Sequence, residues 1–232
     1  MRKICFISGS RADYGLLHNL MRLTKKSKKT KLQLIVTGTH LSSKFGNTYK
    51  EIEEDGFSID SKIRIDLKKD NPSDINKAAA EVMAKISNSY KKLKPDIIIL
   101  LGDRFEMLSS AFAALSMQIP IAHIHGGESS FGSIDEAIRH SITKMSICHF
   151  VSTSIYKKRV IQLGEHPSRV FNLGALATDR IKKLKLFSKK EIEKKLKFKF
   201  NKKNILITFH PATLAENNQR DLKQIFLALN KI

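Results

Sequence analysis

The chain has 232 residues, of which 41% are hydrophobic and 28% charged, and this composition predicts a packed core and excludes global disorder. Its apolar runs are too short or too interrupted to span a bilayer, so no membrane partner is expected. The net charge of +20 comes from lysines concentrated at 24–31 and 181–204, and with no tryptophan and only 7% aromatic residues it indicates a solvated basic surface, not a nucleic-acid partner.

Strand and helix patterns alternate from the N-terminus onward. Apolar runs typical of strands lie at 3–8, 32–38, 96–102, 120–125 and 147–153, with a further strand at 58–66. Segments with helical periodicity lie at 12–26, 44–56, 75–94, 104–118 and 134–146, and Gly56 is expected to end the second of them. Strands separated by helices of this length predict an α/β fold with a parallel sheet and helices on both faces.

A second unit is predicted to begin near residue 165. Its pattern suggests a strand and a connection at 169–181, a helix at 188–198, a strand at 204–210 and a final helix at 216–232. A doubly wound domain needs several βα units, at ~100 or more residues. We therefore expect an N-terminal Rossmann-like domain at 1–165 and an incomplete C-terminal domain at 166–232.

The two cysteines, Cys5 and Cys148, each lie in an apolar run. This position favours buried free thiols in a reducing compartment over a disulfide. The N-terminal segment has a basic start, but its apolar run is too short for the core of a signal peptide. We therefore predict a cytoplasmic location.

Polar groups follow the carboxyl ends of five predicted strands. In an open parallel sheet, ligands bind beyond these ends. The five ends read SGSRADYG (8–15), TGTHLSSKFG (37–46), LGDRFE (101–106), HIHGGE (123–128) and TFHP (208–211). One such end would carry little weight, but five of them predict a single cleft.

Two of these ends each allow two interpretations, because no GxGxxG or GxxxxGK[ST] loop is present. Arg11 could bind a phosphate at a helix N-terminus, or it could be a surface residue with Asp13 supporting the first helical turn. Asp103 could be a catalytic carboxylate and Arg104 a phosphate ligand. Alternatively, Asp103 could be an N-cap, with Glu106 completing a capping box.

The segment that follows HIHGG carries more specific signals. The Gly126–Gly127 pair is expected to let the backbone approach a ligand closely. Ser133 and Glu136 match a capping box, which predicts a structural role for Glu136. Arg139 is expected one turn further along the same helix face.

The remaining polar residues of this region are interpreted one by one. Asp135 lies in the first helical turn, and Glu128 has no capping role. His123 is expected to face the packed side of its strand, His125 to sit at the strand end, and His140 to be a core histidine. The histidines do not fall at a recognised metal spacing, so no metal site is predicted.

These ordered motifs resemble the hydrolysing UDP-N-acetylglucosamine 2-epimerases, the NeuC-like enzymes that open sialic-acid synthesis. The resemblance runs from residue 3 to about 215 through SGSRADYGLL, TGTHLSSKFGNTYKEIEEDGF, LGDRFEML, IPIAHIHGGE, IDEAIRHSITKMS, FVSTSIYKKRVIQLGE, RVFNLGALATDRI and ITFHPAT. It implies a GT-B-like α/β fold of two Rossmann-like, doubly wound parallel-sheet domains, the second incomplete here. It also implies a nucleotide-sugar partner, no cofactor, and a homo-oligomer for the full-length protein.

The implied reaction converts UDP-GlcNAc and water to N-acetylmannosamine and UDP. The family is thought to eliminate UDP across C1–C2 to a glycal, then to add water at C1 while C2 is reprotonated on the other face. Such chemistry needs a base for a weakly acidic C–H bond and cations for the departing diphosphate. A close variant would act on a UDP- or GDP-linked 2,4-diacetamido sugar on the way to legionaminic acid.

The resemblance also implies roles for individual residues. Asp103 and Asp135 fall on catalytic carboxylates. His125 stands where several relatives have a third carboxylate, so either His125 takes the acid/base role or Glu128 supplies the charge. The implied nucleotide-binding residues are Arg11, Gly15, Arg104 and His210, and the possible substrate contacts are His40, Arg139 and His149.

Family members are longer than this chain, and the additional part holds most of the uridine and diphosphate contacts. Three interpretations follow: a fragment of a longer protein, a natural truncation, or a smaller protein with another role. The alternative function is accordingly a truncated, non-catalytic module that binds nucleotide sugars. A nucleic-acid binder rests on charge alone.

Overall fold

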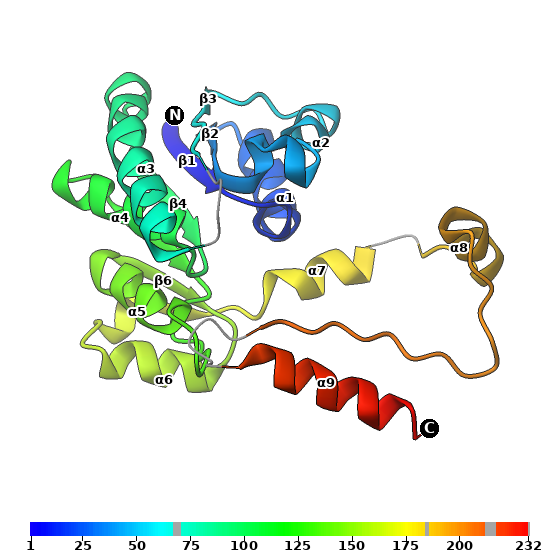
Figure 1. The fold of residues 1–232 in the computed structure, drawn as a ribbon. Helices are drawn as coiled ribbons and strands as arrows, with labels where there is room; N and C mark the ends of the chain where they lie inside the picture. The colour runs from blue at the N-terminus through cyan, green and yellow to red at the C-terminus, as the bar shows by residue number, and fades with distance from the viewer. Residues whose placement is uncertain (67–70, 184–185, 212–216, 232) are drawn as a thin grey trace.

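The computed structural model describes residues 1–66, 71–183, 186–211 and 217–231. At its centre lies a seven-stranded sheet in the order β3-β2-β1-β4-β5-β6-β7, and every pair of neighbouring strands is parallel (Figure 1). The strands are β1 Arg2–Ser8, β2 Thr30–Val36, β3 Ser61–Lys62, β4 Ile97–Leu101, β5 Ile121–Ile124, β6 Cys148–Val151 and β7 Val170–Asn172. The predicted parallel α/β fold is therefore confirmed.

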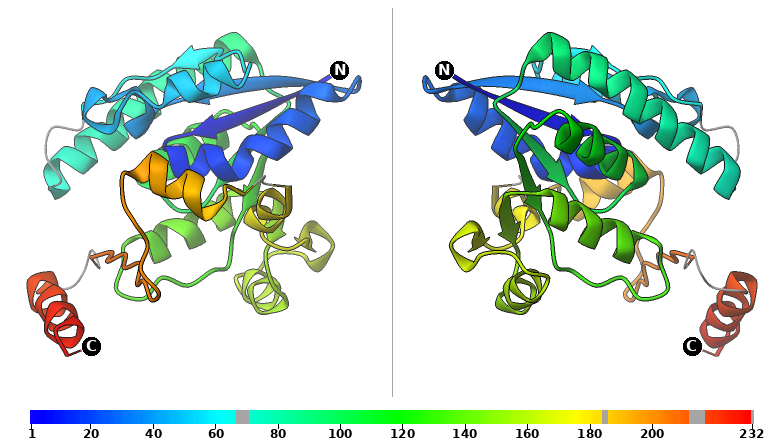
Figure 2. Two further views of the ribbon diagram at one scale, coloured as in Figure 1. Left: turned by 90° about the vertical axis from the view of Figure 1, so that its right-hand side faces the viewer. Right: turned by 90° about the vertical axis from the view of Figure 1, so that its left-hand side faces the viewer.

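Helices connect the strands and cover both faces of the sheet (Figures 1 and 2). They are α1 Arg11–Lys26, α2 Tyr49–Glu54, α3 Pro72–Leu93, α4 Phe105–Ser116, α5 Asp135–Met145, α6 Ser154–Gln162, α7 Leu176–Lys183, α8 Lys189–Leu196 and α9 Asn218–Leu229. Several of these helices begin at a residue whose side chain caps the helix N-terminus. Ser10 caps α1 by accepting from the Asp13 N–H at 3.3 Å, and Asn71 caps α3 by accepting from the Asp74 N–H at 3.0 Å.

Alternating side chains of the central strands build two apolar layers. Cys5 and Ile7 of β1 face α3, α4 and α5, whereas Phe6 faces α1 and α2. Each fully buried side chain of this size contributes about 1.5–3 kcal/mol to stability. A smaller cluster of Val151, Val160 and others holds α6 against β6 and β7.

The helix predicted at 44–56 is broken. Two 3₁₀ turns, Gly38–Leu41 and Ser43–Phe45, precede α2. Gly46 and Asn47 take positive φ values of 83° and 49°, so the chain turns before the helix starts. As predicted, the helical stretch ends at Gly56, whose φ is 80°.

Two expectations about the C-terminal unit are wrong. Val170 of β7 is aligned with His149 of β6, so the strand expected to open a second unit belongs to the first sheet. Residues 204–210 form no strand, because a strand needs a hydrogen-bonding neighbour and no other described residue pairs with them. The division at residue 166 otherwise stays a prediction.

Helix α9 lies apart from the sheet in every view, and Figure 1 shows that α8 also lies away from it (Figures 1 and 2). Helix α8 is formed by local signals alone, since Ser188 and Glu191 make a complete capping box. Within the described ranges, none of the helices combines the length and apolarity needed to cross a bilayer. Both cysteines are free thiols; Cys5 is buried as predicted and Cys148 is half-buried. Burial raises the pKa of both thiols.

Candidate active site

The carboxyl ends of β1, β2, β4, β5 and β6 lie at one edge of the sheet, because all the strands run in the same direction. This edge gathers the polar ends predicted at 8–15, 37–46, 101–106 and 123–128. The fifth predicted end is different, since 208–211 follows no strand. His210 is exposed, and no hydrogen bond or ion pair among the described residues connects it to this edge.

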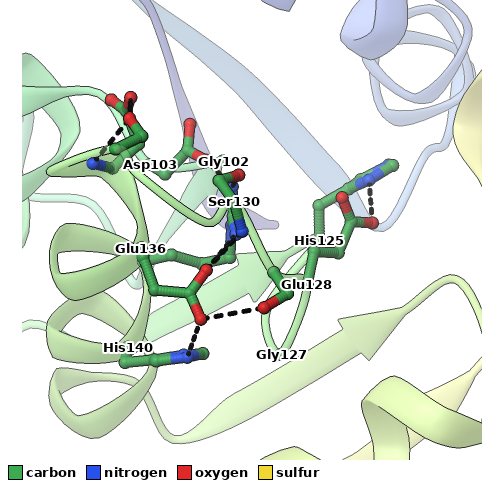
Figure 3. Close-up of polar contacts among 12 residues, drawn as sticks. Gly102, Asp103, His125, Gly127, Glu128, Ser130, Glu136 and His140 are labelled. Atoms are coloured by element: carbon green, nitrogen blue, oxygen red, sulfur yellow. Dashed lines mark hydrogen bonds and ion pairs between the residues drawn. The ribbon is translucent and has the colours of Figure 1, made fainter. Parts of the chain in front are cut away.

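An ion pair joins the end of β4 to α5. Asp103 follows Gly102, and its carboxylate accepts from the Nη2 of Arg139, whose side chain is buried (Figure 3). The same Nη2 donates to the Ser130 hydroxyl at 2.8 Å. Asp103 is therefore not an N-cap: the N-cap of α4 is Arg104, without a side-chain bond. A guanidinium is the stronger partner for a carboxylate than a backbone N–H.

Glu136 ties the loop before α5 to the helix. Its carboxylate accepts from the Ser130 backbone N–H and from the Ser129 hydroxyl, and it lies 3.4 Å from Nε2 of His140 (Figure 3). The Ser130 N–H is the main reason why the pKa of Glu136 is lowered. Glu136 therefore has a structural role, as expected, but it bonds to the loop before α5 and does not complete a capping box.

The predicted Ser133–Glu136 capping box does not form. The Ser133 hydroxyl donates to the carboxylate of Asp135, and the N-cap of α5 is Ile134. The Ser133 oxygen accepts from the backbone N–H of Asp135 at 3.2 Å, and not from that of Glu136 as a capping box requires. Asp135 consequently stands at the very start of α5.

A second hydrogen-bonded group lies at the ends of β5 and β6. The Nδ1 of His125 is 2.7 Å from Oε1 of Glu128, and the Ser152 hydroxyl donates to the same oxygen at 2.9 Å. Burial raises the pKa of Glu128, but the bonds from His125 and Ser152 outweigh this effect and the net pKa is lowered. The Nε2 of His125 is buried and has no hydrogen-bond partner among the residues that the structure describes.

The Gly126–Gly127 pair serves protein packing, which corrects the expectation that it admits a ligand. A Cβ on Gly126 would lie 3.0 Å from Oγ1 of Thr143. A Cβ on Gly127 would lie 2.6 Å from the carbonyl oxygen of Tyr156, and the residue's φ is 78°. Both glycines are buried, so α5 and α6 occupy the space that a ligand would need.

The predicted nucleotide-binding cations are already engaged by carboxylates. The exposed Arg11 places its Nε 3.2 Å from Glu51, and Arg104 holds the buried carboxylate of Glu106 with two bonds of 2.8 and 3.1 Å. Gly15 is half-buried within α1. Asp13 lies close by, and burial raises the pKa of its carboxyl.

Two of the proposed substrate contacts are buried histidines. His40 is hydrogen-bonded to Ser8 at 2.9 Å and to Thr48 at 2.7 Å, and burial lowers its pKa to about 4. The Nε2 of His149 lies 3.0 Å from Glu165. Neither side chain has exposed surface, and a substrate contact by either histidine stays a prediction.

Two further histidine expectations have clear outcomes. His123 is buried as predicted, with Nε2 2.7 Å from the Gly102 carbonyl oxygen and Nδ1 3.1 Å from Thr143. His140 is half-buried against Glu136, so it is not a core residue. Within the described part of the chain, no cluster of three or more His, Cys, Asp or Glu side chains is arranged to hold a metal ion.

Sequence reasoning missed Ser130 and Ser152. Both hold a group that it singled out: Ser130 bonds to Arg139, and Ser152 bonds to Glu128. The rule that ligands bind beyond strand ends would have found Ser152, which directly follows β6. No local pattern marks Ser130.

A family model described as UDP-N-acetylglucosamine 2-epimerase matches residues 22–232. The chain belongs to this epimerase family. It is 47% identical over 232 residues to a GDP/UDP-N,N'-diacetylbacillosamine 2-epimerase (hydrolyzing) of Campylobacter jejuni, covering 100% of this chain and 60% of that protein. It is 39% identical over 211 residues to a UDP-N,N'-diacetylbacillosamine 2-epimerase (hydrolyzing) of Legionella pneumophila, covering 91% of this chain and 56% of that one.

Solved structures of the epimerase family share the fold. The UDP-GlcNAc 2-epimerase of Methanocaldococcus jannaschii superposes with a TM-score of 0.69 at 19% identity, over 99% of this chain and 62% of that one. The Neisseria meningitidis enzyme bound to UDP-GlcNAc gives 0.69 at 17% identity, over 84% and 53%. The GT-B-like α/β class is thereby confirmed. The epimerase-family chain spans about 56–60% of the length of the curated relatives it matches.

Proposed function

We propose that this chain carries the sugar-handling side chains of a hydrolysing nucleotide-sugar 2-epimerase. One observation supports this most: in a member of the epimerase family, two aspartates and a histidine–glutamate pair gather at a single sheet edge. Asp103 is held by Arg139, Asp135 by Ser133, and His125 by Glu128. These groups can supply the acid and base functions that elimination and rehydration need.

The favoured substrate is a UDP- or GDP-linked N,N'-diacetylbacillosamine, the 2,4-diacetamido sugar of a legionaminic-acid route. The names of the Campylobacter and Legionella relatives support this choice. UDP-GlcNAc, hydrolysed to N-acetylmannosamine and UDP on a sialic-acid route, is the second choice. A 40% identical Escherichia coli relative, covering 95% of this chain and 56% of that protein, is named polysialic acid biosynthesis protein P7 and supports it.

The departing diphosphate would meet the arginines at the ends of β1 and β4. Arg11 has a largely exposed side chain, so it can exchange Glu51 for a phosphate at little cost. The guanidinium of Arg104 is fixed by Glu106 along one edge, which presents its other edge in a defined orientation. Gly15 could contribute a backbone contact, and His210 would have to approach from its exposed segment.

The purified chain should release nucleotide from at least one substrate of a panel. The panel contains UDP-GlcNAc and the UDP- and GDP-linked diacetylbacillosamines, and the released nucleotide and sugar are followed by ion-exchange chromatography. Faster turnover of a diacetamido substrate supports the first choice, whereas faster turnover of UDP-GlcNAc supports the second. An absence of nucleotide release from all three would contradict the proposal that this chain is an active epimerase.

The second candidate is a non-catalytic module that binds nucleotide sugars. The observation favouring it is that the chain spans only 56–60% of the length of its curated relatives. Calorimetry separates the two candidates, since binding of UDP or of the nucleotide sugar without turnover supports the module. Neither binding nor turnover would reject both.

A further inference from the structure

The hydrogen-bonded chain Ser152–Glu128–His125 has a defined direction. The Glu128 carboxylate can only accept, because its lowered pKa keeps it ionised. The hydrogen shared at 2.7 Å must therefore reside on Nδ1 of His125, which donates to Glu128. In the neutral ring, Nε2 then carries the lone pair. Within the described part of the chain, this buried nitrogen has no hydrogen-bond partner.

Such an unmet acceptor is costly, at about 1–3 kcal/mol, and so needs an explanation. The backbone at His125 adds to the cost, because its φ of 65° lies in the left-handed region. Strained conformations of this kind cluster at ligand sites. Two independent features thus mark His125 as a residue held ready for a ligand.

Neighbouring elements hold the strained turn in place. The His125 N–H donates to the Phe150 carbonyl oxygen at 3.0 Å, which extends the β5–β6 ladder. Arg159 of α6 donates to the Gly127 carbonyl oxygen. Ser152 lies between β6 and α6 and bonds to Glu128. The hydrogen-bonded chain is therefore anchored at His125 by β5 and β6, and at Ser152 by β6 and α6.

The two aspartates at the sheet edge are less suited to remove a proton. The Asp103 carboxylate is engaged by Arg139, and the Asp135 carboxylate accepts from Ser133. The Nε2 of His125, by contrast, accepts from no donor among the described residues. Glu128 would also stabilise the imidazolium that forms when this nitrogen takes up a proton.

We propose that His125 is the base of the epimerase reaction, and that Glu128 and Ser152 are its positioning residues. The inference rests on the proposed function. Nε2 removes the proton at C2 of the nucleotide sugar: the C2–H bond breaks and the Nε2–H bond forms. The C2–H electron pair becomes the C1=C2 double bond, and the C1–O bond breaks so that the nucleoside diphosphate leaves with its electrons. The imidazolium later returns its proton to water or to the sugar.

The tautomer can be tested without any substrate. Two-dimensional ¹H–¹⁵N NMR of the imidazole nitrogens should show His125 as the Nδ1–H tautomer at neutral pH. Glu128→Ala should convert the signal to a mixture of tautomers, whereas Glu81→Gln on the exposed face of α3 should leave it unchanged. A His125 found as the Nε2–H tautomer would overturn the proposal whatever the enzyme's activity.

The base role is tested by turnover in D₂O. His125→Asn removes the base, and Asn tolerates the left-handed φ, so the fold should be retained. We expect kcat to fall by about 10²–10⁴-fold with little change in KM, together with loss of deuterium exchange at C2. The matched control is His166→Asn, which removes an exposed histidine hydrogen-bonded to Ser168 and should keep full activity.

The positioning roles have a different signature. Glu128→Ala should lower kcat by about 10-fold or more, but less than His125→Asn. Ser152→Ala should lower kcat, and Ser152→Thr, which keeps the hydroxyl, should restore most of it. Retained C2 exchange in His125→Asn would refute the base role. A wild-type chain that has the expected tautomer but releases no nucleotide would instead refute the proposed function and leave the positioning geometry supported.

Discussion

At the scale of single residues, the site depends on buried charge pairs. Arg139 is only 5% exposed, so its guanidinium has lost most of its contact with water. Asp103 and Ser130 replace that contact. A buried charge that loses its partner is strongly destabilising, whereas exposed pairs contribute little. The carboxylate proposed for catalysis therefore also supports the fold.

Replacing Asp103 with asparagine tests whether a buried ion pair contributes more to stability than an exposed one. Asp103→Asn removes the closer of the two carboxylates that pair with Arg139 and leaves only Glu136 at 3.8 Å, so the free energy of unfolding should fall by about 1–3 kcal/mol. Glu81→Gln is the control, because its pair with Lys85 at 3.0 Å is half-exposed and should contribute under about 1 kcal/mol. Urea unfolding measures both. Equal losses in the two variants would contradict this account.

The buried histidines make stability depend on pH. Burial lowers the pKa of His40 and of His123 from 6.5 to about 4. The unfolded chain therefore takes up protons at these rings before the folded protein does. Stability is complete above about pH 6.5 and falls as the pH drops toward about 4, by about 2 kcal/mol per ring at about pH 5.

Urea unfolding across this pH range tests the prediction, with His166→Asn as a control that removes an exposed histidine. His123→Asn should reduce the loss of unfolding free energy at about pH 5 by the contribution of one histidine, about 2 kcal/mol. A free energy of unfolding that stays constant from about pH 7.5 to about pH 5 would show that neither ring is buried in its neutral form.

At the scale of elements, the turn after β5 joins fold and site. The turn carries His125 and Glu128, and its two glycines pack against α5 and α6. The carbonyl of Gly127 accepts from Arg159, so α6 holds the turn through both packing and a hydrogen bond. The position of the proposed base is thus set by a helix that follows it in sequence.

Gly127→Ala should destabilise the protein more than a strained backbone alone explains. Its Cβ would collide with the Tyr156 carbonyl oxygen at 2.6 Å and with Val160 Cγ2 at 2.8 Å. Gly56→Ala is the matched control, because its φ of 80° is equally positive and nothing lies within 4 Å of its Cβ. We expect about 1–2 kcal/mol for Gly56→Ala and clearly more for Gly127→Ala. Thermal unfolding that ranks them in reverse would contradict the packing role of the turn.

At the scale of the whole molecule, the chain divides into a layered sheet and an exposed C-terminal part. Residues 186–211 have no buried side chain, and Leu206 is 95% exposed. Large apolar side chains in contact with water contribute nothing to a core. The stability of the protein therefore resides in the sheet and the helices that cover it.

Limited digestion with trypsin should reflect this division. The first cuts are expected at the exposed lysines of 189–203, whereas Lys91 and Lys92 lie in the last turn of α3 and should be cut later. Mass spectrometry of the early fragments identifies the sites. First cuts within α1 or α3 would contradict the proposed distribution of stability, because cleavage follows local unfolding.

Much of the fold could be predicted from the sequence. The apolar runs at 96–102 and 120–125 form β4 and β5, and the helical periodicity at 75–94 forms most of α3. Parallel strands place their carboxyl ends together, so the sequence alone assigns Asp103 and His125 to one edge of the sheet. These features follow from local periodicity, which a sequence carries directly.

Partners distant in sequence decided the rest. The sequence determined that Asp103, His125 and Asp135 belong to one edge of a parallel sheet. Only the tertiary structure decided that Arg139 takes the carboxylate of Asp103 and that the Gly126–Gly127 pair packs against helices. Among the described residues, it likewise left 204–210 without a neighbouring strand, despite a strand-like pattern. Capping boxes and strands are local preferences of the sequence. A capping box does not form when a side chain finds a stronger partner elsewhere, and a strand does not form when no neighbouring strand is there to pair with it.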